Sequence, residues 1–235
     1  MTKMHLKEDL RKGKRGKTDM YKNFFKRFID ILLSLGGIAL LWLPMLVLAI
    51  IIKLDSKGPV FFRQKRVGKG KTHFNILKFR TMRTDTPHDA PTHELSDPAK
   101  WITKVGAFLR KTSLDELPQL FNILAGQMSV IGPRPALWNQ YDLIEERDKY
   151  GANDVRPGLT GWAQINGRDE LEIPVKARLD GEYVERMSFA FDVKCFFGTV
   201  TSVLRSDGVV EGGTGEMERQ KAEENKAEEN KDGEK

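Results

Sequence analysis

The residues of this sequence with the most evident chemistry are two adjacent carboxylates, Asp115 and Glu116, which follow Ser113. They stand between a basic amphipathic run at 100–111 and an apolar run at 117–124. One interpretation is structural: Ser113 caps a helix, Glu116 completes a capping box, and both acids complement the helix dipole. The other is catalytic, because a carboxylate in a first helical turn stays ionised at neutral pH and can serve as a nucleophile or metal ligand. The pair alone does not decide between the two.

Neighbouring residues of a helix point about 100° apart, so the two carboxylates cannot do the same work on the same atom. One of them can attack a substrate while the other holds a cation. We therefore treat Asp115 and Glu116 as the candidate catalytic pair and as candidate metal ligands.

Cations that suit a phosphate group occur at two places. Lys78 and Arg80 alternate along a predicted strand, which places both on one face, where they can meet either a substrate phosphate or anionic lipid headgroups. Arg134 stands between two prolines, which hold the backbone extended and rigid. A guanidinium fixed in this way suits bidentate phosphate binding, although a surface turn that happens to contain an arginine has the same pattern.

A glycine-punctuated stretch at 155–168 is predicted to be a long loop. Its tryptophan and isoleucine argue against disorder, and a loop of this length is then usually functional. We expect its glycines to allow close backbone approach and its polar side chains, among them Gln164 and Arg168, to contact a substrate.

The composition of the chain limits the classes of partner that it can bind. The 235 residues hold 39 Lys and Arg against 33 Asp and Glu, a formal net charge of +6, which favours phosphates, nucleic acid or an acidic membrane surface as partners. The single cysteine, Cys195, excludes an intrachain disulfide and lies in an apolar run, so we expect a buried, inert thiol and a reducing compartment.

The predicted fold class is α+β, mostly helical with a small β-hairpin. The expected units are a flexible basic arm (1–20), a membrane-inserted helix (21–53), a catalytic domain (54–210) and a charged low-complexity tail (211–235). Within the domain we expect hairpin strands at 60–64 and 74–82, and helices at 100–111, 117–124, 138–150, 170–187 and 189–204. The basic helix at 100–111 suits either a membrane interface or a core-facing position.

The stretch 31–52 holds 22 residues without a charge, and as a helix of about 33 Å it is long enough to cross the hydrocarbon core. It starts too late for a cleavable signal peptide and lacks a small-residue cleavage pattern. The flanks 1–27 and 53–83 each carry ten Lys and Arg, so the positive-inside rule gives no orientation unless both lie in the cytoplasm. Pro44 interrupts the segment, and a kinked helix that enters and returns on one side is slightly favoured over a spanning one.

Five motifs follow one another in the sequence: KLDS with GPVFFRQ (53–64), KFRTM (78–82), SLDELPQLFN (113–122), IGPRP (131–135) and VRPGLTGWAQINGR (155–168). Together and in this order they resemble the bacterial sugar transferase family of monotopic phosphoglycosyl transferases. The match covers 21–207 and leaves out the arm and the tail. Where the family often has Ser-Pro at the break of its membrane helix, this sequence has Leu43-Pro44.

The resemblance implies the transfer of a sugar 1-phosphate from a nucleotide sugar, with a uridine donor expected, to polyprenyl (undecaprenyl) phosphate. It implies a re-entrant helix on the cytoplasmic face of the cell membrane, a donor bound with Mg²⁺, and an aspartyl phosphosugar intermediate on Asp115. It assigns phosphate contacts to Lys78 and Arg134 and, through a looser local match, a functional acid to Asp180.

The implied partners are the donor, the acceptor and membrane lipids, with no nucleic acid; a homo-oligomer is compatible with the sequence. Two alternatives stay open: a non-catalytic basic membrane scaffold, and a glycosyltransferase that moves the sugar without its phosphate.

Overall fold

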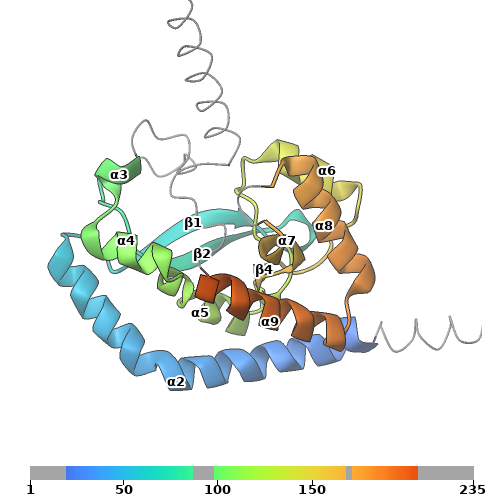
Figure 1. Cartoon of the computed structure of the whole chain (residues 1–235), viewed down its shortest axis with the longest axis horizontal. Coiled ribbons are helices and arrows are strands. Elements are labelled where there is room, and N and C mark those ends of the chain that lie inside the picture. Colours follow the sequence, from blue (N-terminus) through green and yellow to red (C-terminus); the bar gives the residue numbers. More distant parts are fainter. Residues whose placement is uncertain (1–19, 87–97, 168–170, 206–235) are drawn as a thin grey trace, which may run out of the picture.

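The computed structural model describes residues 20–86, 98–167 and 171–205 (Figure 1). In these ranges the protein is mostly helical and contains two two-stranded sheets. The expected helical character is therefore confirmed, while the second sheet was not predicted. The tail at 211–235 and, apart from Met20, the arm lie outside the described residues.

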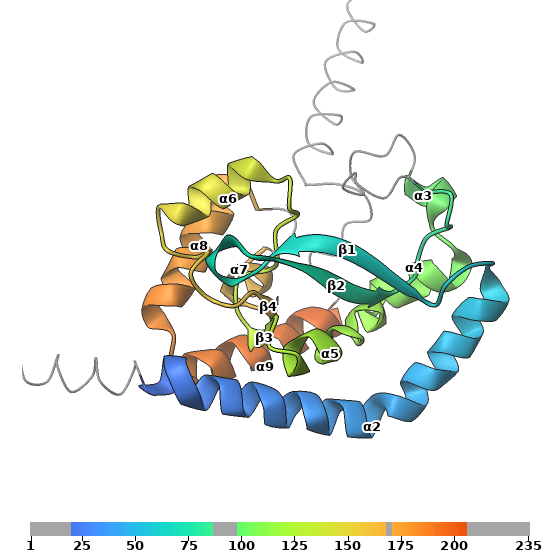
Figure 2. The ribbon, with the colours of Figure 1, turned by 180° about the vertical axis from the view of Figure 1, so that it is seen from behind.

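One long helix underlies the rest of the chain. A π-helical turn, η1 (Tyr21–Phe25), leads directly into α2 (Lys26–Asp55), which has 30 residues. Figures 1 and 2 show α2 as a bent helix that passes beneath α5 and α9 and reaches the hairpin at its far end. Pro44 lies inside α2 and has no N–H to donate to the preceding turn, which is a usual cause of a kink.

The two faces of α2 differ in what they contact. Its inner face packs on the body of the protein, where Met45 and Ile52 are buried against Phe79 and Leu109. Its outer face exposes a set of large apolar side chains: Leu32, Leu33, Leu35, Leu40, Trp42, Leu43, Leu46, Val47, Ile50, Ile51 and Leu54. Only 11% of the most apolar window is buried, and the helix is long and apolar enough to cross a membrane by length and composition. The outer face of α2 is thus consistent with membrane association.

The predicted hairpin is confirmed, with its strands slightly displaced. The strands β1 (Phe61–Val67) and β2 (His73–Phe79) pair antiparallel along their whole length. A short 3₁₀ segment, η2 (Lys69–Lys71), forms the turn, and Gly70 supplies the positive φ of 61° that this turn requires.

The prediction of a single helix at 100–111 is wrong. The chain forms α3 (Pro98–Trp101) and α4 (Lys104–Lys111) instead. The break occurs because Ile102 makes a β-bridge with Met82, after which the Thr103 side chain caps the new helix by accepting a backbone N–H at 2.9 Å. Of the apolar residues of α4, Leu109 is fully buried and Phe108 is 56% exposed, so α4 both faces the core and presents an apolar surface.

The stretch at 155–168 is not one loop, because it contains β4 (Gly158–Thr160) and α7 (Trp162–Ile165). Strand β4 pairs in parallel with β3 (Ser129–Ile131). The expected role of its glycines is confirmed at Gly161, where a Cβ would lie 2.1 Å from the carbonyl oxygen of Gly132. The sequence does not show this sheet because each strand is only three residues long.

The other expected helices are present, three of them within narrower bounds and the last one residue longer than expected. They are α5 (Gln119–Leu124), α6 (Tyr141–Asp148), α8 (Ile173–Arg186) and α9 (Phe189–Arg205). The apolar faces of α5, α8 and α9 meet α2, β2 and β3 in the main core, which includes Ile76, Ile123, Met128, Tyr183 and Phe191. Helix α6 instead buries Leu143 in a smaller cluster with Val67, Ala136 and Ala177. Cys195 is fully buried in this core, and burial raises the pKa of its thiol to about 12, which confirms the expected inert cysteine.

Candidate active site

The two carboxylates lie on a single 3₁₀ turn, η4 (Leu114–Glu116), between α4 and α5. The expected capping box is wrong: Ser113 adopts a left-handed backbone with φ 56°, and its side chain makes no capping hydrogen bond. This conformation costs about 1–2 kcal/mol for a non-glycine residue. It separates α4 from the 3₁₀ turn, and the acids of that turn are held by cationic side chains from other elements instead of by a helix end.

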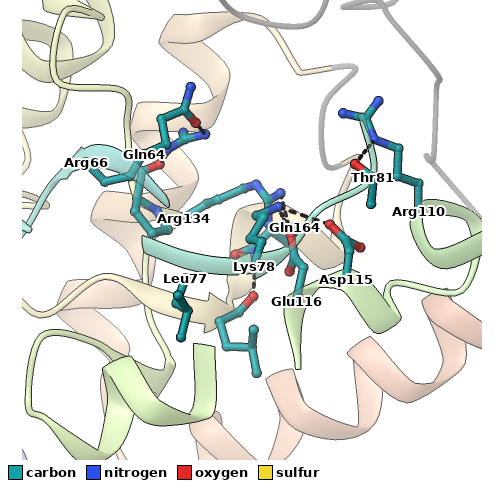
Figure 3. A network of polar contacts seen from close by, with 12 residues as sticks. Gln64, Arg66, Leu77, Lys78, Thr81, Arg110, Asp115, Glu116, Arg134 and Gln164 are labelled. Carbon is teal, nitrogen blue, oxygen red and sulfur yellow. Dashed lines mark hydrogen bonds and ion pairs between the residues drawn. The ribbon is translucent and has the colours of Figure 1, made fainter. Parts of the chain in front are cut away.

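Lys78, near the end of β2, contacts both carboxylates (Figure 3). Its ammonium nitrogen lies 2.8 Å from Glu116 Oε1 and 3.5 Å from Asp115 Oδ2. Asn122 of α5 fixes β2 at this point, because its Oδ1 accepts the N–H of Leu77 at 2.9 Å and its amide nitrogen donates to the carbonyl of Asn75. The helix that follows the two acids therefore also holds the strand that carries Lys78.

Arg134 approaches the same acid from the other side. Its Nη2 donates to Glu116 Oε1 at 2.8 Å, and 31% of its side chain is exposed (Figure 3). The loop that presents it is anchored on β4, where Gly132 N donates to Thr160 O at 2.8 Å and Gly158 N donates to Pro133 O at 2.8 Å. Arg134, which the two flanking prolines predict to be rigidly held, thus contacts a carboxylate in this structure.

The electrostatics of the two acids differ although both are buried. Burial raises the pKa of Asp115, the charge of Glu116 adds to the effect, and Lys78, Arg110 and Arg134 only partly counter it. Burial would also raise the pKa of Glu116, but Arg134 and Lys78 together hold it well below its usual range. Glu116 is therefore the ionised partner of the two cations at neutral pH, and Asp115 is the more basic carboxylate.

This difference divides the chemistry between the two acids. Two close cationic hydrogen bonds fix Oε1 of Glu116, so this side chain orients Lys78 and Arg134 and offsets their charge. Within the described residues, the ionic contact of Asp115 is the longer one to Lys78, and its carboxylate stays basic. Of the two, Asp115 is the one available to form a new bond.

Arg80 has a different set of partners. Its guanidinium donates to the backbone carbonyls of Lys57 and, at 2.7 Å, of Ser56, and the residue is 5% exposed. A Cβ on Gly58 would lie 2.3 Å from Nη1 of Arg80, so the glycine makes room for it. Arg80 thus binds the turn that follows α2, whereas Lys78 binds the two acids. The two cations therefore have separate partners.

Gln164 and Arg168 were expected to contact substrate. The amide nitrogen of Gln164 donates to Leu159 O at 3.0 Å, while its Oε1 is buried and has no hydrogen-bond partner within the described residues. Figure 3 draws Gln164 in the same close view as Lys78 and Glu116. A buried acceptor without a donor is compatible with a ligand contact. Arg168 lies outside the described residues.

Asp180 takes part in a separate buried ion pair. Its Oδ2 accepts from Arg147 Nε at 2.8 Å and from Nη2 at 2.6 Å, which joins α8 to α6. Burial raises the pKa of Asp180 by more than Arg147 lowers it. The contacts of Asp180 are those of a residue that holds two helices together.

Two residues near the site were not predicted. Arg110, which the sequence suggests only as part of a basic helix face, donates to Thr81 at 3.1 Å and contributes positive charge at Asp115 (Figure 3). Asn122 was predicted only as part of an apolar helix. Its signals in the sequence are its polar side chain within that run and its place at the end of the motif at 113–122.

A magnesium site was expected on Asp115 and Glu116. Among the described residues no group of three or more His, Cys, Asp or Glu side chains gathers to hold a metal. Magnesium usually binds through one or two carboxylates together with substrate phosphates and water, and two adjacent carboxylates match that donor set. The residues therefore fit an ion that arrives with a diphosphate, and do not resemble an all-protein cage.

Comparison with known families settles which group the chain falls in. The family model described as "Bacterial sugar transferase" matches residues 21–206. The chain belongs to this family. The five ordered motifs had pointed to the same family, so that prediction is confirmed.

Several relatives are about 40% identical to the chain. A UDP-glucose:undecaprenyl-phosphate glucose-1-phosphate transferase of Xanthomonas campestris is 38% identical over 193 residues, which are 79% of this chain and 40% of that protein. A UDP-N-acetylgalactosamine-undecaprenyl-phosphate N-acetylgalactosaminephosphotransferase of Aeromonas hydrophila is 39% identical over 79% of this chain and 45% of its own length. An exopolysaccharide production protein of Rhizobium leguminosarum is 41% identical over 76% of this chain and 94% of its own length. The chain thus spans less than half of the first two relatives and nearly all of the third.

Proposed function

We propose that this sugar transferase moves a sugar 1-phosphate from a UDP-sugar to undecaprenyl phosphate, through a covalent intermediate on Asp115, as the initiating step of bacterial surface glycan assembly. The donor and acceptor follow from the names of the relatives, and the glycan setting from the exopolysaccharide relative. The observation that carries the mechanism is the unequal state of the two acids: Glu116 is fixed by two cations and Asp115 keeps a basic carboxylate.

In the first half-reaction a carboxylate oxygen of Asp115 attacks the phosphorus that bears the sugar. A P–O bond forms to Asp115, and the P–O bond to the uridine monophosphate breaks and leaves its electron pair there. In the second half-reaction a phosphate oxygen of the acceptor attacks the same phosphorus. The bond to Asp115 breaks, the carboxylate is restored, and the product is a polyprenyl diphosphate sugar.

Lys78 and Arg134 offset the negative charge of the donor phosphates. Glu116 holds both cations close to Asp115 before substrate arrives, so little reorganisation remains when the donor binds. Arg134, the more exposed of the two, is the cation that a diphosphate reaches first.

Magnesium, bound by Asp115 and Glu116 together with the diphosphate, would neutralise charge on the leaving group. Lys78 and Arg134 contact Oε1 of Glu116, and Lys78 contacts Oδ2 of Asp115, so among the described residues the other oxygen of each carboxylate would be the one to hold the ion.

We also propose that α2 enters and leaves the membrane on the cytoplasmic face. Both of its ends are joined to the body of the protein by polar contacts: Lys26 to Asp192 at 2.7 Å at one end, and Arg80 to the carbonyl of Ser56 at the other. A straight helix across a membrane would separate these ends by the bilayer thickness, whereas the bend of α2 keeps both against one body (Figure 2). The exposed outer face of α2 then meets lipid, and the acceptor phosphate reaches the site from the interface.

The test is the nucleotide that is released. Detergent-solubilised protein is incubated with undecaprenyl phosphate and a panel of UDP-sugars. Uridine monophosphate and a lipid that retains the sugar phosphate support the proposal. Release of uridine diphosphate would show that the sugar moves without its phosphate, and no product with any donor would favour the scaffold.

A further inference from the structure

Asp30 is an acid inside the long apolar helix, and it is 3% exposed. Its Oδ1 accepts the hydroxyl of Ser129 at 3.0 Å and the backbone N–H of Val130 at 2.9 Å. A carboxylate buried in such a segment costs free energy unless hydrogen bonds compensate it. Both of its donors lie on β3, so this acid ties α2 to that strand.

The strand β3 leads directly to Arg134. Only Ile131, Gly132 and Pro133 separate Val130 from it. A Cβ on Gly132 would lie 2.6 Å from Arg156 O, and the flanking backbone is hydrogen-bonded to β4. The segment between β3 and Arg134 is therefore tightly packed and cannot easily change its conformation. A shift of β3 relative to α2 is therefore passed on to the guanidinium that contacts Glu116.

Arg27, one helical turn before Asp30, contacts α5, the helix that follows Glu116. Its guanidinium donates to Ile123 O at 2.6 Å and Leu124 O at 2.9 Å, the carbonyls at the C-terminal end of α5. Helix α5 begins three residues after Glu116. A cation at a helix C-terminus is favourable both for the dipole and for the unpaired carbonyls.

One turn of α2 thus contacts both segments that meet at the Glu116–Arg134 pair. We propose that Arg27 and Asp30 are positioning residues: the first turns of the membrane helix set the distance between Glu116 and Arg134, and so couple anchoring to catalysis. This inference rests on the proposed function, because it gives the Glu116–Arg134 pair a role in turnover.

The same region of α2 has a second attachment that serves as a control. Lys26 pairs with Asp192 at 2.7 Å, and Asp192 also accepts from Tyr21 and Tyr183. This cluster joins α2 to α8 and α9. Tyr183 also donates to Ile131 O at 3.1 Å, so among the described residues Lys26 reaches β3 only through Asp192 and Tyr183, whereas Asp30 bonds to β3 directly. Ser34, fully buried one turn after Asp30, donates to Ile31 O of its own helix at 3.1 Å and has no side-chain hydrogen bond to another element in the described part of the chain.

The test compares five variants in detergent: Asp30→Leu, Asp30→Asn, Arg27→Met, Lys26→Met and Ser34→Ala. Steady-state release of uridine monophosphate gives kcat and KM for the donor, thermal unfolding gives Tm, and hydrogen exchange reports on the peptide at 129–134 with no substrate present. Asp30→Leu and Arg27→Met should lower kcat about 10- to 100-fold, the scale of a misplaced catalytic group. Asp30→Asn keeps the Oδ1 acceptor and should stay within about threefold of wild type, since the two hydrogen bonds survive.

Lys26→Met should lower Tm with little change in kcat per folded molecule, and Ser34→Ala should change neither. Exchange at 129–134 should quicken in Asp30→Leu and not in Lys26→Met. The inference is overturned if Lys26→Met loses as much kcat as Asp30→Leu and Arg27→Met, or if these two keep wild-type kcat. Where Asp30→Leu does not fold, Arg27→Met decides, because its side chain is only partly buried. If the wild type releases no uridine monophosphate, the proposed function fails, and the exchange comparison still decides the positioning role.

Discussion

Lys78 Nζ lies 2.8 Å from Glu116 Oε1, closer than its 3.5 Å contact with Asp115 Oδ2. The lysine is therefore shared unequally between two adjacent acids, and Arg134 adds a second cation to the same Glu116 oxygen. This inequality separates the roles of the acids, because the more strongly paired one stays ionised and the other keeps a basic carboxylate.

The pH dependence follows from the coupling of the two acids. Asp115 must be ionised to attack, and its pKa in the folded protein is raised, first by burial and then by the charge of Glu116. Turnover should fall as the pH drops through this raised pKa. Glu116→Gln removes the like charge, so the acid limb of the kcat/KM profile should move down by roughly one pH unit while the maximum rate falls.

Glu145→Gln, an exposed position on α6, is the control and should leave the acid limb in place. An acid limb that stays or moves up in Glu116→Gln would mean that Glu116 does not act on the ionisation of Asp115.

Arg134→Lys tests the planar, rigidly held guanidinium. Lysine keeps the charge but loses the forked donor geometry, so we expect a loss of roughly 1–3 kcal/mol in transition-state stabilisation, measured as kcat/KM. Arg63→Lys, on the exposed edge of β1, is the matched control and should be neutral. A wild-type kcat/KM in Arg134→Lys would show that the guanidinium makes no specific contact in the transition state and that the Pro-Arg-Pro segment only shapes a turn.

Asp180→Asn tests whether Asp180 has a functional role beyond its helix contact. Breaking a buried ion pair from one side costs about 3–5 kcal/mol, so the variant should unfold at a markedly lower temperature. At a temperature where it is folded, its kcat per folded molecule should stay near that of the wild type, because Asp180 is paired with Arg147 of α6 and not with a group of the acid turn. A large fall in kcat with an unchanged Tm would place Asp180 in the reaction.

The path of α2 through the membrane is tested by cysteine labelling in intact cells. In a Cys195→Ala background, Leu10→Cys and Lys69→Cys lie on the two flanks of α2. A re-entrant helix predicts that neither is labelled by an impermeant reagent until the cells are permeabilised. Labelling of position 10 alone from outside would show a spanning helix.

How much of this the sequence predicts depends on the range of the interactions involved. Residues whose neighbours in sequence restrict them, such as Arg134 between two prolines, are predictable as rigid elements, and the hairpin follows from local alternation. The contact of Arg134 with Glu116 depends on the pairing of β3 with β4. These strands have three residues each and lie far apart in the sequence, and their close approach needs glycine at 132, 158 and 161.

The capping box failed for a related reason. Ser113 and Glu116 have the right types and spacing, but the Ser113 backbone is left-handed and Glu116 is drawn to Lys78 and Arg134. Long-range ionic contacts thus override the local preference. Asp30 and Arg27 differ from this, because no local motif was assigned to them. The sequence shows two charged residues at the start of an apolar helix, but it does not show that they bond to β3 and α5.

The most direct test of the account is to trap the intermediate. Wild-type protein is incubated with UDP-sugar labelled in the sugar and with no acceptor, beside Asp115→Asn, which keeps the shape of the side chain but cannot form an acyl phosphate. Label should remain on the wild-type protein, be released by hydroxylamine and pass to undecaprenyl phosphate when it is added, and it should be absent from Asp115→Asn, whose turnover falls by orders of magnitude at a near-normal Tm. Robust turnover by Asp115→Asn, or wild-type protein that turns over without ever carrying label, would contradict the covalent mechanism.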